Sequence, residues 1–370
     1  MKILVMGASA RAVAHSVAES GHEPLGVDYF GDCDLRKIAE WRMLDKSTPL
    51  SVTAESLSAE GAVWASGIEN RPEMITELKN AGIKVFSSSC ESIKRCRDLE
   101  ELEKFCAARG FRRPRTSMSS PPGDDGGEWL VKRVKSGAGI GVMDWKPGSG
   151  AELQEGRYIQ ERIAGVSISA VFLADGRDAV LCGASRQLAG EPSLGAEGYA
   201  WCGNIMPFEA PPGERSALLR ELARLAGSIA LYFGLSGAVG VDCVLSGGKL
   251  YILEINPRIC ASFELVELTR GLKIFDLHMR ALEGELPREF DGLLDGPRRG
   301  KGIVYAPQNL TAPDTGAWYN YERRDIPRSG SPLPAGAPIC TVLTPPFASD
   351  AEVMAYLGGE AAKIWKECGL

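Results

Sequence analysis

Residues 241–258, VDCVLSGGKLYILEINPR, decide the fold of this chain because they predict two paired strands that carry oxygen ligands. Glu254 and Asn256 lie two apart in an alternating run, so both side chains should project from one face about 6.5 Å apart. Asp242, on the first strand, adds a third oxygen ligand. Mg²⁺ prefers a few carboxylate or amide oxygens together with substrate phosphates and water, and Arg258 remains for an anionic substrate. The stretch predicts a magnesium site, with a plain hairpin bearing solvated acids as the alternative.

The turn of this hairpin sets a geometric condition on that site. A two-residue turn at Gly247-Gly248 without any irregularity would pair Asp242 with Leu253. Asp242 would then lie on the opposite face from Glu254, because side chains alternate along a strand. The magnesium hypothesis therefore predicts an odd loop or a β-bulge in the hairpin.

Composition restricts the class of protein. The chain has 370 residues and a formal charge of −6, with acids and bases mixed along it, and this argues against a nucleic-acid partner. The start, MKILVMGASARAVAHS, lacks the unbroken apolar stretch of a secretory signal, and no run is long enough to span a membrane. The ten cysteines form no CxxC pair, so we expect no zinc site and a cytoplasmic protein.

The order of apolar patterns predicts an α/β protein built of several units. Residues 1–90 alternate strands and helices, which favours a doubly wound parallel sheet. From residue 129 the pattern changes to hairpins, and residues 215–233 carry apolar side chains at helical spacing before the ligand hairpin. Residues 269–283 predict another helix. The chain from residue 301 to 344 is rich in Pro and Gly between short β runs, which predicts a small β appendage, and a last helix is expected over residues 351–366.

Three further motifs are weak when each is taken alone. Residues 7–12, GASARA, with Asp28 downstream, imitate a dinucleotide fingerprint, but Ser9 stands where a glycine must let the pyrophosphate approach the backbone. Lys132 precedes the small-residue loop 136–141, SGAGIG, which could hold phosphates or be an ordinary hairpin loop. Glu161 ends an apolar strand whose following linker could contact an adenine.

Along the chain, Lys132 with its glycine loop comes first, Glu161 at the end of an apolar strand comes second, and Asp…Glu-x-Asn comes third. This order of motifs resembles the ATP-grasp superfamily, most strongly at LEINPR. More narrowly, the opening VMGASARAVAHSVAESGHEPLGVDYFGD and the tail RDIPRSGSPLPAGAPICTVLT resemble predicted ATP-dependent carboligases of methanogens and methylotrophs. The resemblance implies an ATP-grasp fold with a pre-ATP-grasp domain over 1–95 and an ATP-grasp domain over 96–290. The latter would comprise a lid at about 111–180 and a metal-binding lobe at about 181–290. A C-terminal β appendage and closing helix would occupy 291–370.

The resemblance also implies roles for individual residues. ATP would be held by Lys132, Ser136, Gly137, Gly139, Gly141, Glu161, Arg162 and Ala164. Mg²⁺, with Mn²⁺ as an alternative, would be held by Asp242, Glu254 and Asn256. Arg258 would steady the transferred phosphate or acyl phosphate, and Arg186 would contact the γ-phosphate. The superfamily often has Asp-Lys where this chain has Asp98-Leu99, so Arg97 or Lys94 would have to replace that lysine.

The expected function is therefore an ATP- and Mg²⁺-dependent carboxylate–amine ligase that forms an amide through an acyl phosphate. Its partners would be a small carboxylate and a small amine, with neither nucleic acid nor membrane, and a homodimer is one permitted assembly. Group resemblance points to one-carbon cofactor synthesis. The alternatives are a carboxylase acting on bicarbonate, an NAD-dependent oxidoreductase that uses residues 7–12, and a nucleotide-binding regulator without catalysis.

Overall fold

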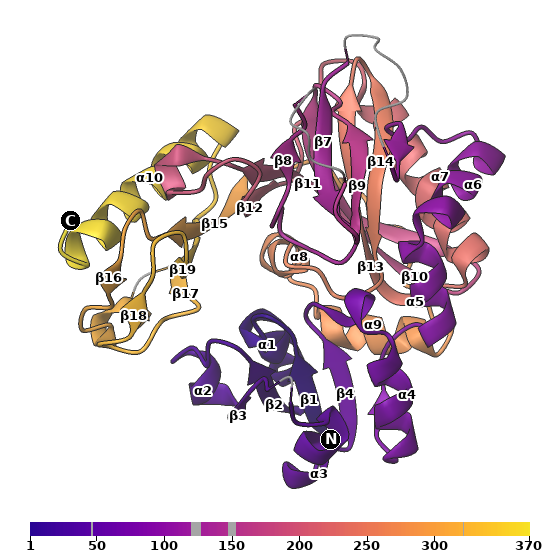
Figure 1. The fold of residues 1–370 in the computed structure, drawn as a ribbon. Helices are drawn as coiled ribbons and strands as arrows, with labels where there is room; N and C mark the ends of the chain where they lie inside the picture. The colour runs from indigo at the N-terminus through magenta and orange to yellow at the C-terminus, as the bar shows by residue number, and fades with distance from the viewer. Residues whose placement is uncertain (46, 120–126, 147–152, 321) are drawn as a thin grey trace.

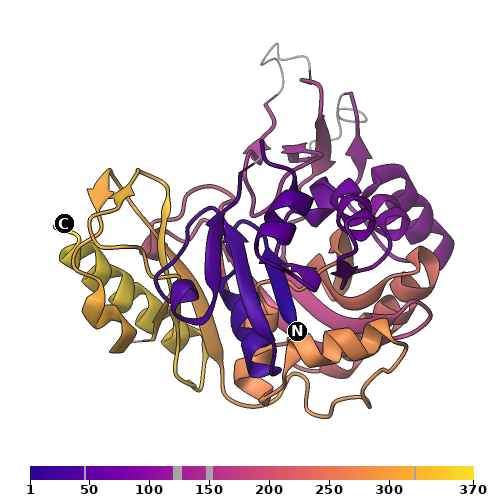
Figure 2. The same ribbon diagram turned by 90° about the horizontal axis from the view of Figure 1, so that it is seen from below.

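The computed structural model describes residues 1–45, 47–119, 127–146, 153–320 and 322–370. Two large sheets and one small sheet dominate the fold (Figure 1). A view from below places the N-terminal sheet across the middle of the molecule, with the C-terminal helix to one side (Figure 2). The largest of these sheets has eight strands, and the candidate site lies on it.

The N-terminal unit is a five-stranded sheet in the order β3-β2-β1-β4-β5, with parallel pairing throughout. Its central strands, β1 (Lys2–Met6) and β4 (Gly61–Trp64), are short apolar runs buried almost throughout, which is typical of parallel sheets covered on both faces. The other strands are β2 (Glu23–Asp28), β3 (Glu40–Met43) and β5 (Lys84–Val85). The helices are α1 (Arg11–Glu19), α2 (Leu35–Ile38), α3 (Leu50–Ser56), η1 (Ile68–Asn70) and α4 (Glu73–Asn80).

Two consecutive helices lead to a small antiparallel sheet that we call the lid. The helices are α5 (Cys90–Arg97) and α6 (Leu99–Arg109), and the Asp98 side chain between them caps α6 by accepting from the backbone N–H groups of Glu100 and Glu101. The lid has the order β6-β9-β7-β8. Its strands are β6 (Thr116–Ser117), β7 (Trp129–Arg133), β8 (Met143–Asp144) and β9 (Arg157–Glu161).

The large sheet has the order β14-β13-β10-β11-β12-β15-β19-β17 and is antiparallel at every pairing. Helix α7 (Arg215–Phe233) packs on one face, and α8 (Phe263–Arg270) and α9 (Ile274–Leu282) pack on the other, next to the N-terminal unit. The strands are β10 (Val166–Asp175), β11 (Ala179–Ala189), β12 (Trp201–Met206), β13 (Ser236–Ser246), β14 (Lys249–Asn256), β15 (Arg299–Tyr305), β17 (Arg323–Arg324) and β19 (Pro338–Leu343).

The remaining elements cover the C-terminal end of this sheet. Helix α10 (Asp350–Glu367) packs there with an apolar cluster of its own. A two-stranded sheet stands apart from the large one and pairs β16 (Leu310–Thr311) with β18 (Pro332–Leu333). The short helices are η2 (Pro192–Leu194) and η3 (Gly316–Asn320).

Three expectations about boundaries are corrected by the structure. The lid sheet ends at Glu161, not near residue 180, because β10 and β11 pair within the large sheet. The C-terminal region is not a separate β appendage, because β15, β17 and β19 extend the same sheet. The helix expected over residues 269–283 is interrupted at Gly271, which takes φ of +64° as the C-cap of α8.

Candidate active site

The hairpin β13–β14 contains the bulge that the sequence predicted. Gly247-Gly248 form a two-residue turn, with φ of +52° and +71°. The pairing register then shifts by one residue at Leu253, so Asp242 stands directly opposite Glu254. Because cross-strand partners share a face, the bulge brings both carboxylates to the same side of the sheet. The prediction of an irregular hairpin is confirmed.

Each carboxylate already has polar partners. Asp242 accepts a hydrogen bond at Oδ1 from Gln187 Nε2 (2.9 Å) and at Oδ2 from Asn256 Nδ2 (3.0 Å). Glu254 accepts at Oε2 from Arg97 Nη1 (3.1 Å). The Asn256 bond uses its amide nitrogen, which leaves the amide oxygen as a further ligand atom on the same face.

The pKa values of the two carboxyl groups shift in opposite directions. Desolvation, together with the neighbouring Glu254 carboxylate, raises the pKa of Asp242 to about 7. Desolvation would also raise the pKa of Glu254, but Arg97 and then Lys132 hold that pKa below its ordinary value. Two adjacent carboxylates whose charges oppose each other are suited to a cation between them.

The donor set fits Mg²⁺ better than a metal that needs a full protein cage. No group of three or more His, Cys, Asp or Glu side chains is placed to hold a metal ion within the ranges that the structure describes. Two carboxylates and the Asn256 amide oxygen are present instead. Mg²⁺ is commonly held by one or two carboxylates and keeps its other positions for water and phosphates. Asp242, Glu254 and Asn256 therefore fit the ion that the sequence predicted.

Lys132 comes to this site from the lid, and we call the site formed by Asp242, Glu254, Asn256 and Lys132 the cleft. It lies on β7, and its Nζ donates to Gln160 Oε1 on β9 (2.9 Å). Desolvation lowers the pKa of its amino group, while Glu254 and Asp242 act in the opposite direction. The structure thus places Lys132 within the electrostatic reach of the two carboxylates, which belong to the other sheet.

The glycine loop after Lys132 is docked on the large sheet. The backbone carbonyl of Ala138 accepts from the N–H of Trp201 (3.0 Å), and the Tyr199 hydroxyl donates to Asp144 (2.5 Å). Gly139, with φ of +72°, lies so close to the Tyr199 carbonyl that a β-carbon would not fit. A glycine is required at this contact both by the φ value and by the close approach.

The other loop positions differ in their surroundings. Gly137 has open space where a β-carbon would be, whereas Gly141, with φ of +77°, lies against the Arg133 side chain. The Ser136 hydroxyl donates to the Arg133 carbonyl (3.2 Å). The loop is therefore fixed at Gly139 and open at Gly137.

The residues expected to contact adenine have partners of their own. The Glu161 carboxylate accepts from Arg115 Nε and Nη2, both at 3.0 Å. Arg162 forms an ion pair with Glu128 (2.9 Å), and Ala164 is exposed in the linker to β10. The linker is in the expected place, but Glu161 would have to share its carboxylate with Arg115 to accept from an adenine amine.

Arg258 joins the end of β14 to the N-terminal unit. Its Nε and Nη2 donate to Glu69 on η1 (2.9–3.1 Å), and its Nη1 donates to the Ala65 carbonyl (3.2 Å). Glu69 is 8% exposed, and the Arg258 guanidinium, opposing desolvation, holds its pKa below the ordinary value. This bidentate pair fixes the direction of the guanidinium.

Arg186 is not brought to the carboxylates. Its neighbour on β11, Gln187, bonds Asp242, so Arg186 points to the other face by strand alternation. There its guanidinium pairs with Asp350 at the start of α10 (3.5 Å). The γ-phosphate contact expected for Arg186 is inconsistent with this orientation.

The turn that imitates a dinucleotide fingerprint is filled by the protein itself. Asp28 accepts from the backbone N–H groups of Ala10, Phe30 and Gly31 and from Trp41 Nε1, so its carboxylate is engaged by donors of the protein itself. This geometry does not support the NAD-dependent alternative.

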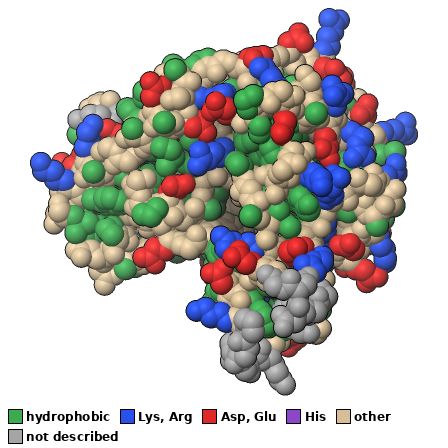
Figure 3. Space-filling view, turned by 90° about the horizontal axis from the view of Figure 1, so that it is seen from above, with side chains coloured by type: hydrophobic (Ala, Val, Ile, Leu, Met, Phe, Trp, Pro, Cys, Tyr) green, Lys and Arg blue, Asp and Glu red, His purple; other side chains and the backbone are tan. Residues whose placement is uncertain are grey.

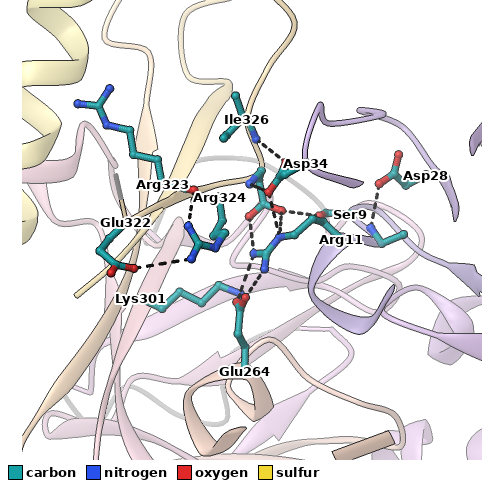
Figure 4. A network of polar contacts seen from close by, with 12 residues as sticks. Ser9, Arg11, Asp28, Asp34, Glu264, Lys301, Glu322, Arg323, Arg324 and Ile326 are labelled. Atoms are coloured by element: carbon teal, nitrogen blue, oxygen red, sulfur yellow. Dashed lines mark hydrogen bonds and ion pairs between the residues drawn. The ribbon is translucent and has the colours of Figure 1, made fainter. Parts of the chain in front are cut away.

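A buried ionic network adjoins this turn and joins three parts of the chain (Figure 4). Arg11, 1% exposed, donates to Asp325 (3.0 and 3.1 Å) and to Glu264 on α8. Glu264 also accepts from Lys301 on β15 (2.6 Å). Each fully buried charge is thus paired, which is the condition for tolerating charges in an interior.

Residues 96–262 match the family model described as the ATP-grasp domain. That range begins just before Arg97 and ends just after Arg258, so it contains the lid and both carboxylates. The chain therefore contains an ATP-grasp domain, and the predicted superfamily and fold are confirmed.

Two proteins are similar to this chain over most of its length. The uncharacterised protein MJ0776 of Methanocaldococcus jannaschii is 22% identical over 93% of this chain and 88% of its own length. The L-amino acid ligase from Bacillus licheniformis has a TM-score of 0.70 at 14% identity, with 98% of this chain and 97% of that chain covered.

A third relative is the biotin carboxylase domain dimer of 2-oxoglutarate carboxylase from Hydrogenobacter thermophilus, in complex with MgADP, ADP and bicarbonate. Its TM-score is 0.68 at 14% identity, over 93% of this chain and 85% of that chain. The predicted enzyme class, an ATP-dependent ligase, is supported by these comparisons.

Two further findings concern the surface and the helices. Acidic and basic side chains are interspersed over the face seen from above, without a basic stripe (Figure 3). In the described ranges, no helix combines the length and the apolar character that crossing a bilayer requires.

Proposed function

We propose that this chain is an ATP- and Mg²⁺-dependent carboxylate–amine ligase that forms an amide through an acyl phosphate. The observation that carries the proposal is the pair Asp242 and Glu254, brought to one face by the bulge and facing Lys132 of the lid. The ATP-grasp match over the same residues supports it.

The proposed reaction has two steps. A carboxylate oxygen attacks the γ-phosphorus of ATP, the bond to ADP breaks, and an acyl phosphate forms. An amine nitrogen then attacks the acyl carbon, phosphate leaves, and the nitrogen loses a proton. Neither step needs a protein nucleophile, so positioning and electrostatics are the protein's contribution.

The residues of the cleft have separable roles in this proposal. Asp242, Glu254 and Asn256 would hold Mg²⁺, which, when bound, neutralises charge on the phosphates. Lys132 and the loop 136–141 would hold the phosphates from the lid side. Arg258, fixed by Glu69, would stabilise the anionic acyl phosphate between the strand end and the N-terminal unit.

The acceptor would be a small amine, and the other substrate a small carboxylate. A role in one-carbon cofactor synthesis is proposed on group resemblance and on the methanogen relative alone. A carboxylase acting on bicarbonate is the second candidate, and the neighbour bound to bicarbonate favours it.

Product analysis separates these candidates. The protein would be incubated with MgATP and panels of carboxylates, with and without amines, and products followed by phosphorus NMR. We expect ADP and phosphate only when a carboxylate and an amine are both present. AMP with pyrophosphate would overturn the acyl-phosphate route, and ADP release that needs bicarbonate but no amine would favour the carboxylase.

A further inference from the structure

Arg97 occupies one of the two carboxylate oxygens of Glu254. It is the last residue of α5, its side chain is 14% exposed, and its Nη1 donates both to Glu254 Oε2 (3.1 Å) and to the Ile255 carbonyl (3.2 Å). Its backbone is fixed, because Asp98 begins the next helix as its N-cap. Only the side chain of Arg97 is therefore free to change its partner.

A guanidinium and Mg²⁺ compete for this carboxylate. A metal bound at Glu254 Oε2 would lie a few ångströms from Arg97 Nη1, and the repulsion between like charges at that separation is large in a partly desolvated cleft. Lys132 adds a further positive charge close by, as its effect on the pKa of Glu254 indicates. The contact that is observed and the proposed metal contact therefore compete with each other.

The phosphates of a nucleotide offer Arg97 an alternative partner. Guanidinium groups match phosphate oxygens in geometry and keep their charge when desolvated. Leu99, the second residue after Arg97, cannot supply a cation at this helix junction. Lys94 is exposed, whereas Arg97 is the residue directed into the cleft.

We propose that Arg97 is a resident counter-ion of Glu254 that gives way to the metal and transfers to the nucleotide phosphates. In the nucleotide-free protein, Arg97 neutralises Glu254. When metal and nucleotide bind together, the metal binds the Glu254 carboxylate and the Arg97 guanidinium rotates to the phosphates. Glu254 thus exchanges Arg97 for the metal, and Arg97 exchanges Glu254 for the phosphates. This inference rests on the proposed function because it uses the same metal and nucleotide site.

The test exploits two effects of opposite sign. In Arg97→Gln, Mn²⁺ should bind the nucleotide-free protein roughly three- to tenfold more tightly, since a competing ion pair worth about one salt bridge is gone. Affinity for MgADP should fall by about tenfold, since a charged phosphate contact is lost. Mn²⁺ would be titrated by electron paramagnetic resonance and MgADP by calorimetry at saturating Mg²⁺.

Two variants serve as controls. Lys94→Gln removes the same charge from an exposed position on the same helix and should change neither affinity by more than about twofold. Arg97→Lys keeps the charge, so its affinities for Mn²⁺ and for MgADP should both lie between those of the wild type and those of Arg97→Gln. A residue that merely supports the fold would weaken both ligands together, and circular dichroism would report the loss of structure.

Several results would overturn the proposal. Weaker or unchanged Mn²⁺ binding in Arg97→Gln contradicts the competition, as does the absence of Mn²⁺ binding in both proteins. Unchanged MgADP affinity contradicts the transfer to phosphate. If the wild-type protein binds no MgADP, the proposed function itself fails, and the Mn²⁺ titration still decides whether Arg97 shields Glu254.

Discussion

The charge of Asp242 should make the metal-free protein less stable as the pH rises. Its folded-state pKa is raised from 3.8 to about 7. An acid with a raised folded pKa keeps its proton in the folded state where the unfolded chain has lost it, so stability falls as the pH rises from about 4 to about 7. Asp242→Asn carries no such charge and should escape this loss.

The magnitude follows from the size of that shift. About three pKa units correspond to an upper limit of about 4 kcal/mol, at 1.36 kcal/mol per unit. Part of this loss of stability takes place below pH 5. Asp242 is also only half-buried and lies beside Glu254, which reduces the effect further. Between pH 5 and pH 8 we expect the wild type to lose roughly 1–2 kcal/mol relative to Asp242→Asn, or a few degrees in melting temperature.

Thermal unfolding of both proteins at pH 5 and pH 8 measures this difference. Asn cannot accept the hydrogen bonds from Gln187 and Asn256 as Asp does, so the two proteins will differ in melting temperature at every pH. The informative quantity is therefore how that difference in melting temperature changes between pH 5 and pH 8. Saturating Mg²⁺ at pH 8 should restore the wild type but not the variant. Glu55→Gln, at an exposed site on α3, is the control. A difference that stays constant with pH would refute the reasoning.

Three other perturbations test separate parts of the structure. Glu69→Gln should free the Arg258 guanidinium and so lower kcat at least roughly tenfold, while KM for ATP stays within about threefold. Steady-state kinetics measures both constants, and a rise in KM as large as the fall in kcat would argue against this role of Glu69. Gly139→Ala should weaken MgADP binding by roughly tenfold and raise hydrogen exchange in the loop, whereas Gly359→Ala, on α10 with open space for a β-carbon, should do neither; equal effects would contradict the docking. Arg11→Met should cost about 3–5 kcal/mol of unfolding free energy because Asp325 loses its guanidinium partner while Glu264 keeps only Lys301, and an unchanged melting temperature would exclude that role.

Local patterns in the sequence predicted the local parts of the fold. The amphipathic helix over residues 215–233 has the bounds of α7, because its apolar period of 3.6 is continuous and Gly234 ends it with φ of +63°. The bulge was predicted because a metal site on this hairpin requires it. Both inferences need only neighbours in the chain.

Long-range contacts were beyond the reach of such patterns. Glu69 bonds Arg258 from 189 positions away, and Gln187 bonds Asp242 from another strand. Arg97 was only one of two candidates for the missing lysine, because a helix-end arginine carries no sign of the direction it takes. The sequence around Arg186 does not show which face of β11 this residue occupies.

The predicted boundaries of the lid and of the C-terminal region are wrong for a related reason. The β runs of the lid and of the large sheet have the same local pattern, so pairing partners, not propensity, decide where the lid ends. The same applies to β15, β17 and β19. Their short apolar runs predict strands but do not state that these strands extend the sheet that carries the carboxylates.

The most direct test of the account is the metal dependence of nucleotide binding at Glu254. Calorimetric titration with ADP, with and without Mg²⁺, needs no knowledge of the substrates. We predict that Mg²⁺ strengthens ADP binding at least roughly tenfold in the wild type and fails to do so in Glu254→Ala, which should remain folded because that side chain is 41% exposed in the cleft. An equal Mg²⁺ effect in both proteins, or no ADP binding by the wild type, would contradict the account.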